Sequence, residues 1–291
     1  MSLDLTGDLV ALFRDIVDVE SVSGNEKELA DLVEAALRGL PHLDVVRDGD
    51  TVIARTTLGR AERVVVAGHL DTVPVADNLP SRVEDGVVYG RGTCDMKGGI
   101  AVALACAAAL TEPRRDVTWV FYDHEEVAAE FNALTRIARE HPEWLAGDFA
   151  VLMEPTSAGV EGGCQGTLRF TLTTTGVAAH SARSWLGHNA IHDAADVLGR
   201  LQRYRPREVE VDGLTYREGL NAVAISGGIA GNVVPDACTI TVNFRFAPDR
   251  DEADALAHCR QVFDGHELAV VDVAAGARPG LDRPIAQEFL A

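Results

Sequence analysis

Histidine and carboxylate residues stand directly after three short apolar runs of the sequence. The runs cover residues 64–68, 117–122 and 149–153, and the residues that follow them are His69, Asp71, Glu125, Glu126 and Glu154. Another carboxylate, Asp95, lies in a glycine-rich segment between the first two runs. Histidine and carboxylates without cysteine form a ligand set that suits zinc, cobalt or manganese and can leave coordination positions open. Because grouped carboxylates repel one another unless cations neutralise them, the pattern predicts a metal site.

Each of these residues has a simpler interpretation when it is taken alone. His69 could be a hydrogen-bonded histidine of the core. The pair Glu125 and Glu126 could begin a helix, where the helix dipole favours acidic residues. The joint appearance of such residues at three successive apolar runs favours the metal-site interpretation.

The segments around these residues predict an α/β domain. The apolar runs are typical of strands that are buried on both faces of a sheet. A helix at 97–110 separates the first two runs, a helix at 127–139 separates the second from the third, and residues 44–57 alternate around a hairpin signal. Strands that alternate with helices form a mostly parallel sheet with covered faces. The carboxyl ends of such strands share one crevice, so the predicted ligands converge there, and Asp95 can reach it from the start of the first helix.

The pattern of predicted elements changes near Gly166. The expected order is strand 167–175, helix 189–203, strands 220–226 and 237–246, helix 251–263 and strand 268–274. This β-α-β-β-α-β order is that of a ferredoxin-like domain, which we interpret as an insertion. The expected domains are therefore 1–174, to which 279–291 return, and 175–278.

Composition excludes several classes of function. Acidic residues outnumber basic ones 45 to 26, and the resulting net charge of −19 argues against nucleic-acid and membrane partners. The five cysteines form no C-x-x-C pair, which favours a reducing cytoplasm over a disulfide framework. The longest apolar stretch, residues 98–110, is shorter than the ~20 residues that span a bilayer. The start of the chain lacks the features of a secretory signal, so a cytoplasmic protein is expected.

Four motifs together resemble the zinc aminoacylase/carboxypeptidase superfamily. They are Gly68-His-Leu-Asp-Thr-Val-Pro74, Gly90-Arg-Gly-Thr-Cys-Asp-Met-Lys-Gly-Gly99, Asp123-His-Glu-Glu126 and Glu154-Pro155. Within this superfamily, Glu154-Pro-Thr and Gly231-Asn-Val-Val-Pro235 are most similar to succinyl-diaminopimelate desuccinylases. The resemblance implies cleavage of N-succinyl-LL-2,6-diaminopimelate to succinate and LL-2,6-diaminopimelate, in lysine and diaminopimelate biosynthesis. It also implies that the ferredoxin-like domain serves as a lid and mediates homodimerisation.

Two zinc ions, one of them replaceable by cobalt, are implied by the same resemblance. Asp95 would bridge them, and His69 and Glu154 would complete the protein ligands of one ion. Glu126 would bind the other ion together with a histidine from near the C-terminus of the family. Asp71 would orient His69, in keeping with the need of ligating imidazoles for an anionic partner.

Four further residues match catalytic or substrate-binding positions of the family. Glu125 would be the general base that takes a proton from the attacking water. His180 would reach the site of the neighbouring subunit and stabilise the oxyanion, although a solvent-exposed loop histidine is the simpler interpretation. Asn232 and Arg245 would contact a small N-acyl amino acid substrate, and Arg245 suits its carboxylates. The alternative for Arg245 is a salt bridge at a strand edge.

The sequence departs from the family pattern in two places. The chain ends before the last metal-ligand histidine of the family, so we expect a C-terminally truncated site in which the ion at Glu126 lacks a ligand. Part of the first sheet is then expected to be uncovered. Residues 163–166 read Gly-Cys-Gln-Gly where some desuccinylases carry arginines. The alternative functions are therefore those of an aminoacylase, a deacetylase or a dipeptidase of the same superfamily. A further alternative is an inactive, truncated metal-binding dimer.

Overall fold

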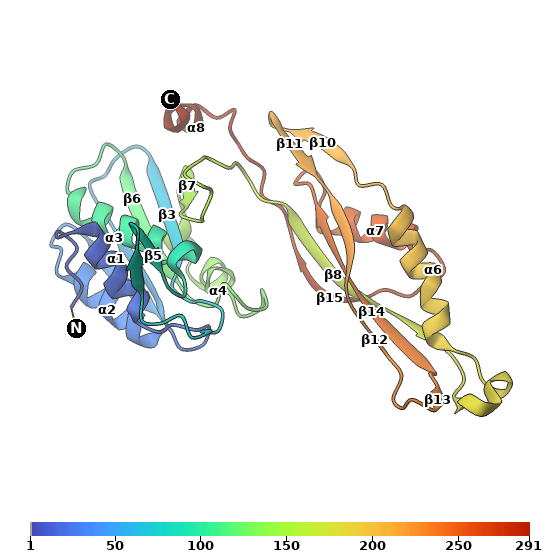
Figure 1. Ribbon diagram of the computed structural model, residues 1–291. Coiled ribbons are helices and arrows are strands. Elements are labelled where there is room, and N and C mark those ends of the chain that lie inside the picture. Colours follow the sequence, from blue (N-terminus) through green and yellow to red (C-terminus); the bar gives the residue numbers. More distant parts are fainter. Residues whose placement is uncertain (1) are drawn as a thin grey trace. The chain divides into compact units, whose positions relative to one another are not determined.

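The computed structural model describes residues 2–291, which form two compact units (Figure 1). The first unit ends at Val160, and the second covers Glu161–Ala291. The boundary expected from the sequence, at 174, falls inside strand β8 (Gly166–Thr175), and all of β8 pairs with a strand of the second unit. Residues 279–291 also group with the second unit.

The sheet of the first unit has five strands in the order β1-β2-β6-β3-β7. The strands are β1 (Asp44–Asp48), β2 (Thr51–Arg55), β3 (Arg63–His69), β6 (Asp116–Tyr122) and β7 (Phe149–Leu152). β3 lies parallel to both β6 and β7, as predicted, whereas β1 with β2 and β2 with β6 are antiparallel. The prediction of a mostly parallel sheet is therefore wrong, and the sheet is mixed. The hairpin at Gly49, whose φ is 60°, makes β1 and β2 antiparallel, and β2 joins the sheet antiparallel to β6.

Helices cover both faces of this sheet. α1 (Leu9–Asp18), α2 (Lys27–Arg38) and α3 (Gly98–Ala109) pack with one set of strand residues, which includes Trp119 and Phe121. α4 (Ala133–Glu140) packs with the opposite set, which includes Val120 and Tyr122, and α5 (Pro142–Leu145) adds Leu145. Side chains of a strand alternate between faces, so the fully buried β6 supplies both cores. Burial of each large apolar side chain contributes about 1.5–3 kcal/mol.

Between β3 and α3 the chain forms the short hairpin β4 (Arg82–Glu84) and β5 (Val87–Tyr89), followed by the distorted turn η1 (Thr93–Lys97). Gly92 precedes this turn with a φ of 78°, and a Cβ there would lie 2.7 Å from Thr72 Cγ2. Only glycine combines this conformation with this close approach. The turn carries Asp95 and leads directly into α3.

The second unit contains a four-stranded antiparallel sheet in the order β12-β14-β8-β15. Its elements are β8, α6 (Ala190–Arg203), β12 (Gly219–Gly227), β14 (Ala237–Phe246), α7 (Glu252–Val262) and β15 (Ala269–Ala274). The chain order is thus the predicted β-α-β-β-α-β. One face of the sheet packs on α6 and α7 through a core that includes Phe170, Phe244 and Phe263.

Shorter elements complete the second unit. They are β9 (Ala179–His180), η2 (Ser181–Leu186), β10 (Glu208–Val211), β11 (Leu214–Arg217), β13 (Val233–Val234) and α8 (Pro284–Leu290). β9 pairs with β13, and β10 forms a hairpin with β11. In the described residues, 2–291, none of the helices has the length and apolar character that a membrane span requires.

Candidate metal centre

His69 ends strand β3 and is almost fully buried, with 1% of its surface exposed. Its ring Nδ1 lies 2.9 Å from the backbone oxygen of Asp71. A carbonyl oxygen only accepts, so Nδ1 carries a proton and the other ring nitrogen, Nε2, is available as a ligand. Burial lowers the pKa of His69, but neighbouring carboxylates, above all Asp71, outweigh it and raise this pKa to about 9. A bound cation would displace the Nε2 proton.

Three carboxylates surround the Nε2 atom of His69. Asp95 Oδ1 lies 3.1 Å away and Glu154 Oε1 lies 3.9 Å away. Ligand atoms of His69, Asp95 and Glu126 all lie within 4.8 Å of one another. Four residues that the sequence predicts as ligands thus come together, from three strand ends and the turn before α3. Imidazole nitrogen and carboxylate oxygens at this spacing are a donor set that fits zinc.

Asp71 has more contacts than the sequence analysis predicts. Its carboxylate is fully buried and accepts hydrogen bonds from the amides of Glu125 and Glu126, both at 3.0 Å, and from Ser23 Oγ at 2.7 Å. Burial raises the pKa of Asp71, but hydrogen bonds from His69 and these groups lower it to about 2. The same carboxylate therefore lies beside His69 and holds the segment that carries Glu125 and Glu126.

The other carboxylates of the site lie close enough together to raise one another's pKa. Burial, reinforced by Asp95 and Glu125 and opposed by His69, raises the pKa of Glu154 to about 7. Burial also raises the pKa of Glu125 and of Glu126, and the charge of Asp95 adds to both shifts. Like charges that suppress one another's ionisation in this way are relieved by a bound cation. The raised pKa values of these carboxyl groups and the types of ligand atom therefore both favour a bound cation.

Two residues that sequence reasoning missed hold the segment after β6. His124 has a φ of 60°, and its backbone amide donates to Glu26 Oε1 at 3.2 Å. The His124 ring Nδ1 lies 2.7 Å from Asp123 Oδ2. Glu26 is fully buried, and burial raises its pKa. The sequence signal at Glu26 indicates the start of a helix, and nothing local indicates a contact with a segment 98 residues away.

Lys97 is a third residue to which the sequence alone assigns no role. Its side chain is 1% exposed, and Nζ donates to the Val19 carbonyl at 2.7 Å. Burial lowers the pKa of Lys97 to about 8. Because Lys97 follows Asp95 by two residues, this bond fixes the turn that carries Asp95 to the end of α1.

The second unit brings two of the other predicted residues together. His180 pairs with Val233, the neighbour of Asn232, and the Asn232 carbonyl accepts from the Ser181 amide at 2.9 Å. His180 is exposed, and its Nδ1 accepts from the Ala182 amide at 3.1 Å. The proton of the neutral ring therefore lies on Nε2, which remains a free donor.

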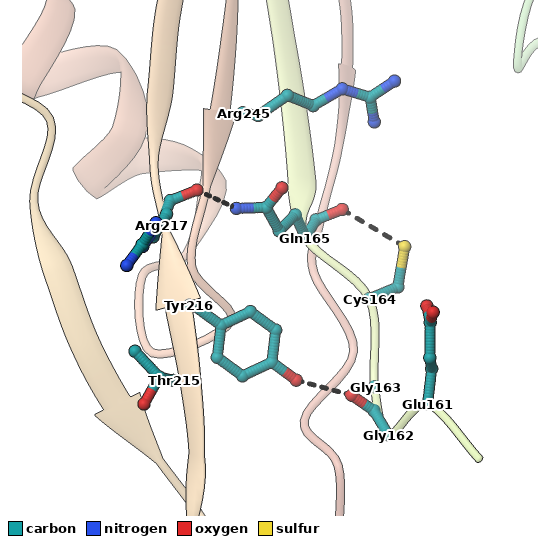
Figure 2. Close-up of a pocket in the computed structure, with 9 residues that line it drawn as sticks. All are labelled: Glu161, Gly162, Gly163, Cys164, Gln165, Thr215, Tyr216, Arg217 and Arg245. Atoms are coloured by element: carbon teal, nitrogen blue, oxygen red, sulfur yellow. Dashed lines mark hydrogen bonds between the residues drawn. The ribbon is translucent and has the colours of Figure 1, made fainter. Parts of the chain in front are cut away.

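Arg245 lies on β14 and lines a pocket of the second unit (Figure 2). Within residues 2–291 its guanidinium has no hydrogen bond and no ion pair, so the salt bridge considered as an alternative does not form. Neither His180 nor Asn232 lines this pocket.

Comparison with known proteins identifies the family of the chain. A family profile described as peptidase family M20/M25/M40 matches residues 65–281. The chain is 52% identical, over 293 residues, to the succinyl-diaminopimelate desuccinylase of Corynebacterium glutamicum, covering 97% of this chain and 79% of that protein. A Mycobacterium tuberculosis protein assigned to the same enzyme is 55% identical over 291 residues, with 99% and 82% covered. The chain belongs to the peptidase family M20/M25/M40.

Solved structures share the fold at low sequence identity. An M20 family metallo-carboxypeptidase from Sulfolobus solfataricus matches with a TM-score of 0.76 at 16% identity, covering 97% of this chain and 82% of that one. A Bacillus subtilis protein described as a dinuclear metal-binding peptidase of the M20 family matches with a TM-score of 0.66 at 19% identity, covering 93% and 74%. These likenesses establish the fold class of the chain, a mixed α/β fold.

Proposed function

We propose that this chain hydrolyses the amide bond of N-succinyl-LL-2,6-diaminopimelate, releasing succinate and LL-2,6-diaminopimelate for lysine and diaminopimelate biosynthesis. The observation that carries the proposal is the convergence of His69, Asp95, Glu126 and Glu154 in a chain that is 52% identical to a named desuccinylase over 97% of its length. The expected compartment is the cytoplasm, where the five free cysteines would stay reduced.

Two zinc ions are the proposed cofactors, and cobalt is a candidate for one position. Asp95 would lie between the ions, His69 and Glu154 would hold one, and Glu126 would hold the other. When bound, the ions lower the pKa of a water molecule and polarise the amide carbonyl. The 3.1 Å separation of His69 Nε2 and Asp95 Oδ1 supports this assignment, as does the contact of Nδ1 with the Asp71 backbone oxygen, which leaves Nε2 as the ring nitrogen that faces the carboxylates.

Glu125 is the proposed general base. It would accept a proton from the attacking water and return it to the leaving amine nitrogen, so that the same carboxyl serves both halves of the reaction. Two features support this role. Burial raises the pKa of Glu125 above its ordinary value, and the hydrogen bond from its amide to Asp71 holds its backbone in place.

The second unit is proposed to act as the lid and to mediate homodimerisation. His180 Nε2–H would donate to the oxyanion in the neighbouring subunit, while Asn232 and Arg245 would contact the substrate. β12 ends the four-stranded sheet, and its Val223 and Ile225 are 59% and 51% exposed. A sheet edge with exposed apolar side chains supports association with a second copy.

The proposal is tested by measuring succinate release from N-succinyl-LL-2,6-diaminopimelate by the 291-residue chain supplied with zinc. Release that zinc chelation abolishes is the expected result. N-acetyl amino acids and dipeptides serve as comparison substrates. Faster turnover of either would overturn the desuccinylase assignment in favour of an aminoacylase, deacetylase or dipeptidase.

A further inference from the structure

The backbone of His124 is in the left-handed conformation, with a φ of 60°, and Glu125 and Glu126 follow it directly. The Cβ atom disfavours this conformation, so a residue other than glycine keeps it where its surroundings hold it there. A return of His124 to a negative φ would redirect the chain that follows and carry the amides of Glu125 and Glu126 away from Asp71, which accepts from both. The conformation of His124 therefore determines where the proposed general base lies.

Glu26 supplies a contact that holds this conformation. Its Oε1 accepts a hydrogen bond from the His124 amide at 3.2 Å and lies 3.5 Å from the ring Nδ1. Glu26 directly precedes α2 and is fully buried, so water does not compete for this oxygen. Loss of a hydrogen bond to a carboxylate shifts a conformational equilibrium by about 10–100-fold, which is similar in size to the bias of an ordinary residue against left-handed backbone. This bond is therefore strong enough to decide the conformation of His124.

The other contacts of this segment hold side chains rather than the backbone of His124. The ring Nδ1 lies 2.7 Å from Asp123 Oδ2, and Asp123 Oδ1 accepts from Thr51 Oγ1 at 2.5 Å. These bonds fix the imidazole ring and the carboxylate of the preceding residue. Within residues 2–291, Glu26 Oε1 is the only acceptor for the His124 amide.

The second carboxylate oxygen of Glu26 argues against a role in stability alone. Among the described residues, this oxygen, Oε2, is buried without a hydrogen-bond partner. A buried polar atom without a partner lowers stability, and an apolar side chain at this position would avoid that loss. Such groups call for a specific explanation, and they often lie at functional sites.

We propose that Glu26 is a positioning residue for the proposed general base: it holds His124 in the left-handed conformation and so fixes the place of the Glu125 carboxylate. The effect on catalysis rests on the proposed function, because it concerns the base of that reaction. Without this acceptor His124 would populate negative φ values, and the fraction of sites with Glu125 in place would fall. This loss lowers kcat in proportion and leaves KM unchanged, because the base is not needed for the substrate to bind.

Glu26→Met removes both carboxylate oxygens and keeps a side chain of similar length. With zinc supplied, kcat for succinate release should fall by about 10–100-fold while KM changes by less than about twofold. Glu26→Gln keeps an acceptor oxygen and should keep kcat within about fivefold of the wild-type value. Glu28→Met is the matched control, because it makes the same replacement at an exposed position of α2, and it should keep the wild-type kcat. A wild-type kcat in Glu26→Met, shown to be folded by thermal unfolding, would overturn the inference.

Substitutions of His124 test the backbone conformation directly, and they do so even if Glu26→Met does not fold. His124→Asn and His124→Val both remove the imidazole, but asparagine tolerates the left-handed conformation and β-branched valine does not. We expect kcat of His124→Val to be about tenfold or more below that of His124→Asn. Because glycine adopts a positive φ without support, adding His124→Gly to Glu26→Met should raise kcat by about tenfold. Equal kcat values for the asparagine and valine variants would contradict the role of the backbone.

Amide exchange separates this inference from the proposed function. If N-succinyl-LL-2,6-diaminopimelate is not hydrolysed, the proposed function fails, but hydrogen–deuterium exchange at the amides of residues 124–126, followed by NMR, still tests the segment. The exchange rates should rise by about 10–100-fold in Glu26→Met and stay at the wild-type values in Glu28→Met. Unchanged exchange in a folded Glu26→Met would refute the positioning role.

Discussion

At the scale of single residues, Asp71 connects two parts of the proposed metal centre. The backbone oxygen of Asp71 sets which nitrogen of His69 carries a proton, and its carboxylate accepts from the amides of Glu125 and Glu126. The carboxylate is fully buried, so water cannot replace these bonds. Asp71 therefore positions two proposed metal ligands, His69 and Glu126, and the proposed general base, Glu125.

Asp71→Asn tests this connection. The variant removes a buried negative charge and turns a donor toward an amide N–H, so the free energy of unfolding should fall by about 2–4 kcal/mol. Zinc content after dialysis should fall as well. Asp116→Asn is the control, because Asp116 is also buried and accepts from the amides of Leu58 and Arg60, away from the site. It should lose stability but keep zinc, and a zinc-loaded Asp71→Asn would contradict the connection.

Glu125 and Glu126 are adjacent, yet their proposed roles differ. In Glu125→Gln the proton acceptor is lost, so kcat for succinate release should fall by about 10³-fold while bound zinc is retained. In Glu126→Gln zinc content itself should fall. Elemental analysis of the two purified variants separates the roles, and loss of metal from Glu125→Gln would argue against a general base at that position.

At the scale of elements, the segment after β6 depends on contacts from other elements. The amides of three successive residues, His124, Glu125 and Glu126, all donate to carboxylates that come from outside the segment. These carboxylates belong to Glu26 and Asp71. Such bonds hold a loop in one conformation where no helix or sheet ladder is available to do so. The proposed catalytic geometry is therefore a property of the packed unit rather than of the loop.

The packing of α7 gives a prediction about pH. Cys259 of α7 is fully buried, and burial raises the pKa of its thiol from 9.0 to about 12. Between these values the unfolded chain loses the proton while the folded chain keeps it, so the contribution of Cys259 to stability is present below pH 9 and is lost as pH rises. From pH 8 to 10 the free energy of unfolding of wild type should fall by roughly 1 kcal/mol more than that of Cys259→Ala. Denaturant unfolding of both proteins measures this difference, and parallel pH profiles would contradict it.

At the scale of the whole molecule, the proposed dimer combines residues of two subunits in one site. Glu125→Gln would inactivate the subunit that carries it, because the general base is lost. His180→Ala would inactivate the site of the neighbouring subunit, because the donor to the oxyanion is lost. After the two variants are mixed and allowed to exchange subunits, about a quarter of the sites would combine an intact Glu125 with an intact His180. Succinate release should therefore recover to about a quarter of the wild-type rate. If exchange is shown by labelled subunits and activity is not recovered, the sites are not shared.

Local patterns predicted that histidine and carboxylate side chains would converge at one edge of the first sheet. Three strand ends and one glycine-rich turn were assigned from apolar runs and glycine positions, and His69, Asp95, Glu126 and Glu154 come together in the structure. The side chains converge because the ends of parallel strands share one edge of a sheet whatever the neighbouring segments do. The β-α-β-β-α-β order of the second unit follows from patterns of the same kind.

Only the tertiary structure decided which distant segments meet. The antiparallel pairing of β2 with β6, the bond from His124 to Glu26 and the bond from Lys97 to Val19 all join residues more than fifty positions apart. Hydrophobic periodicity reports which face of an element is buried, but it carries no information about the partner that buries it. Polar contacts across such distances arise when packing removes water and leaves each buried group to find a partner. Hence the sequence alone indicates which residue types could carry out the chemistry. The hydrogen bonds that position those residues are known only from the tertiary structure.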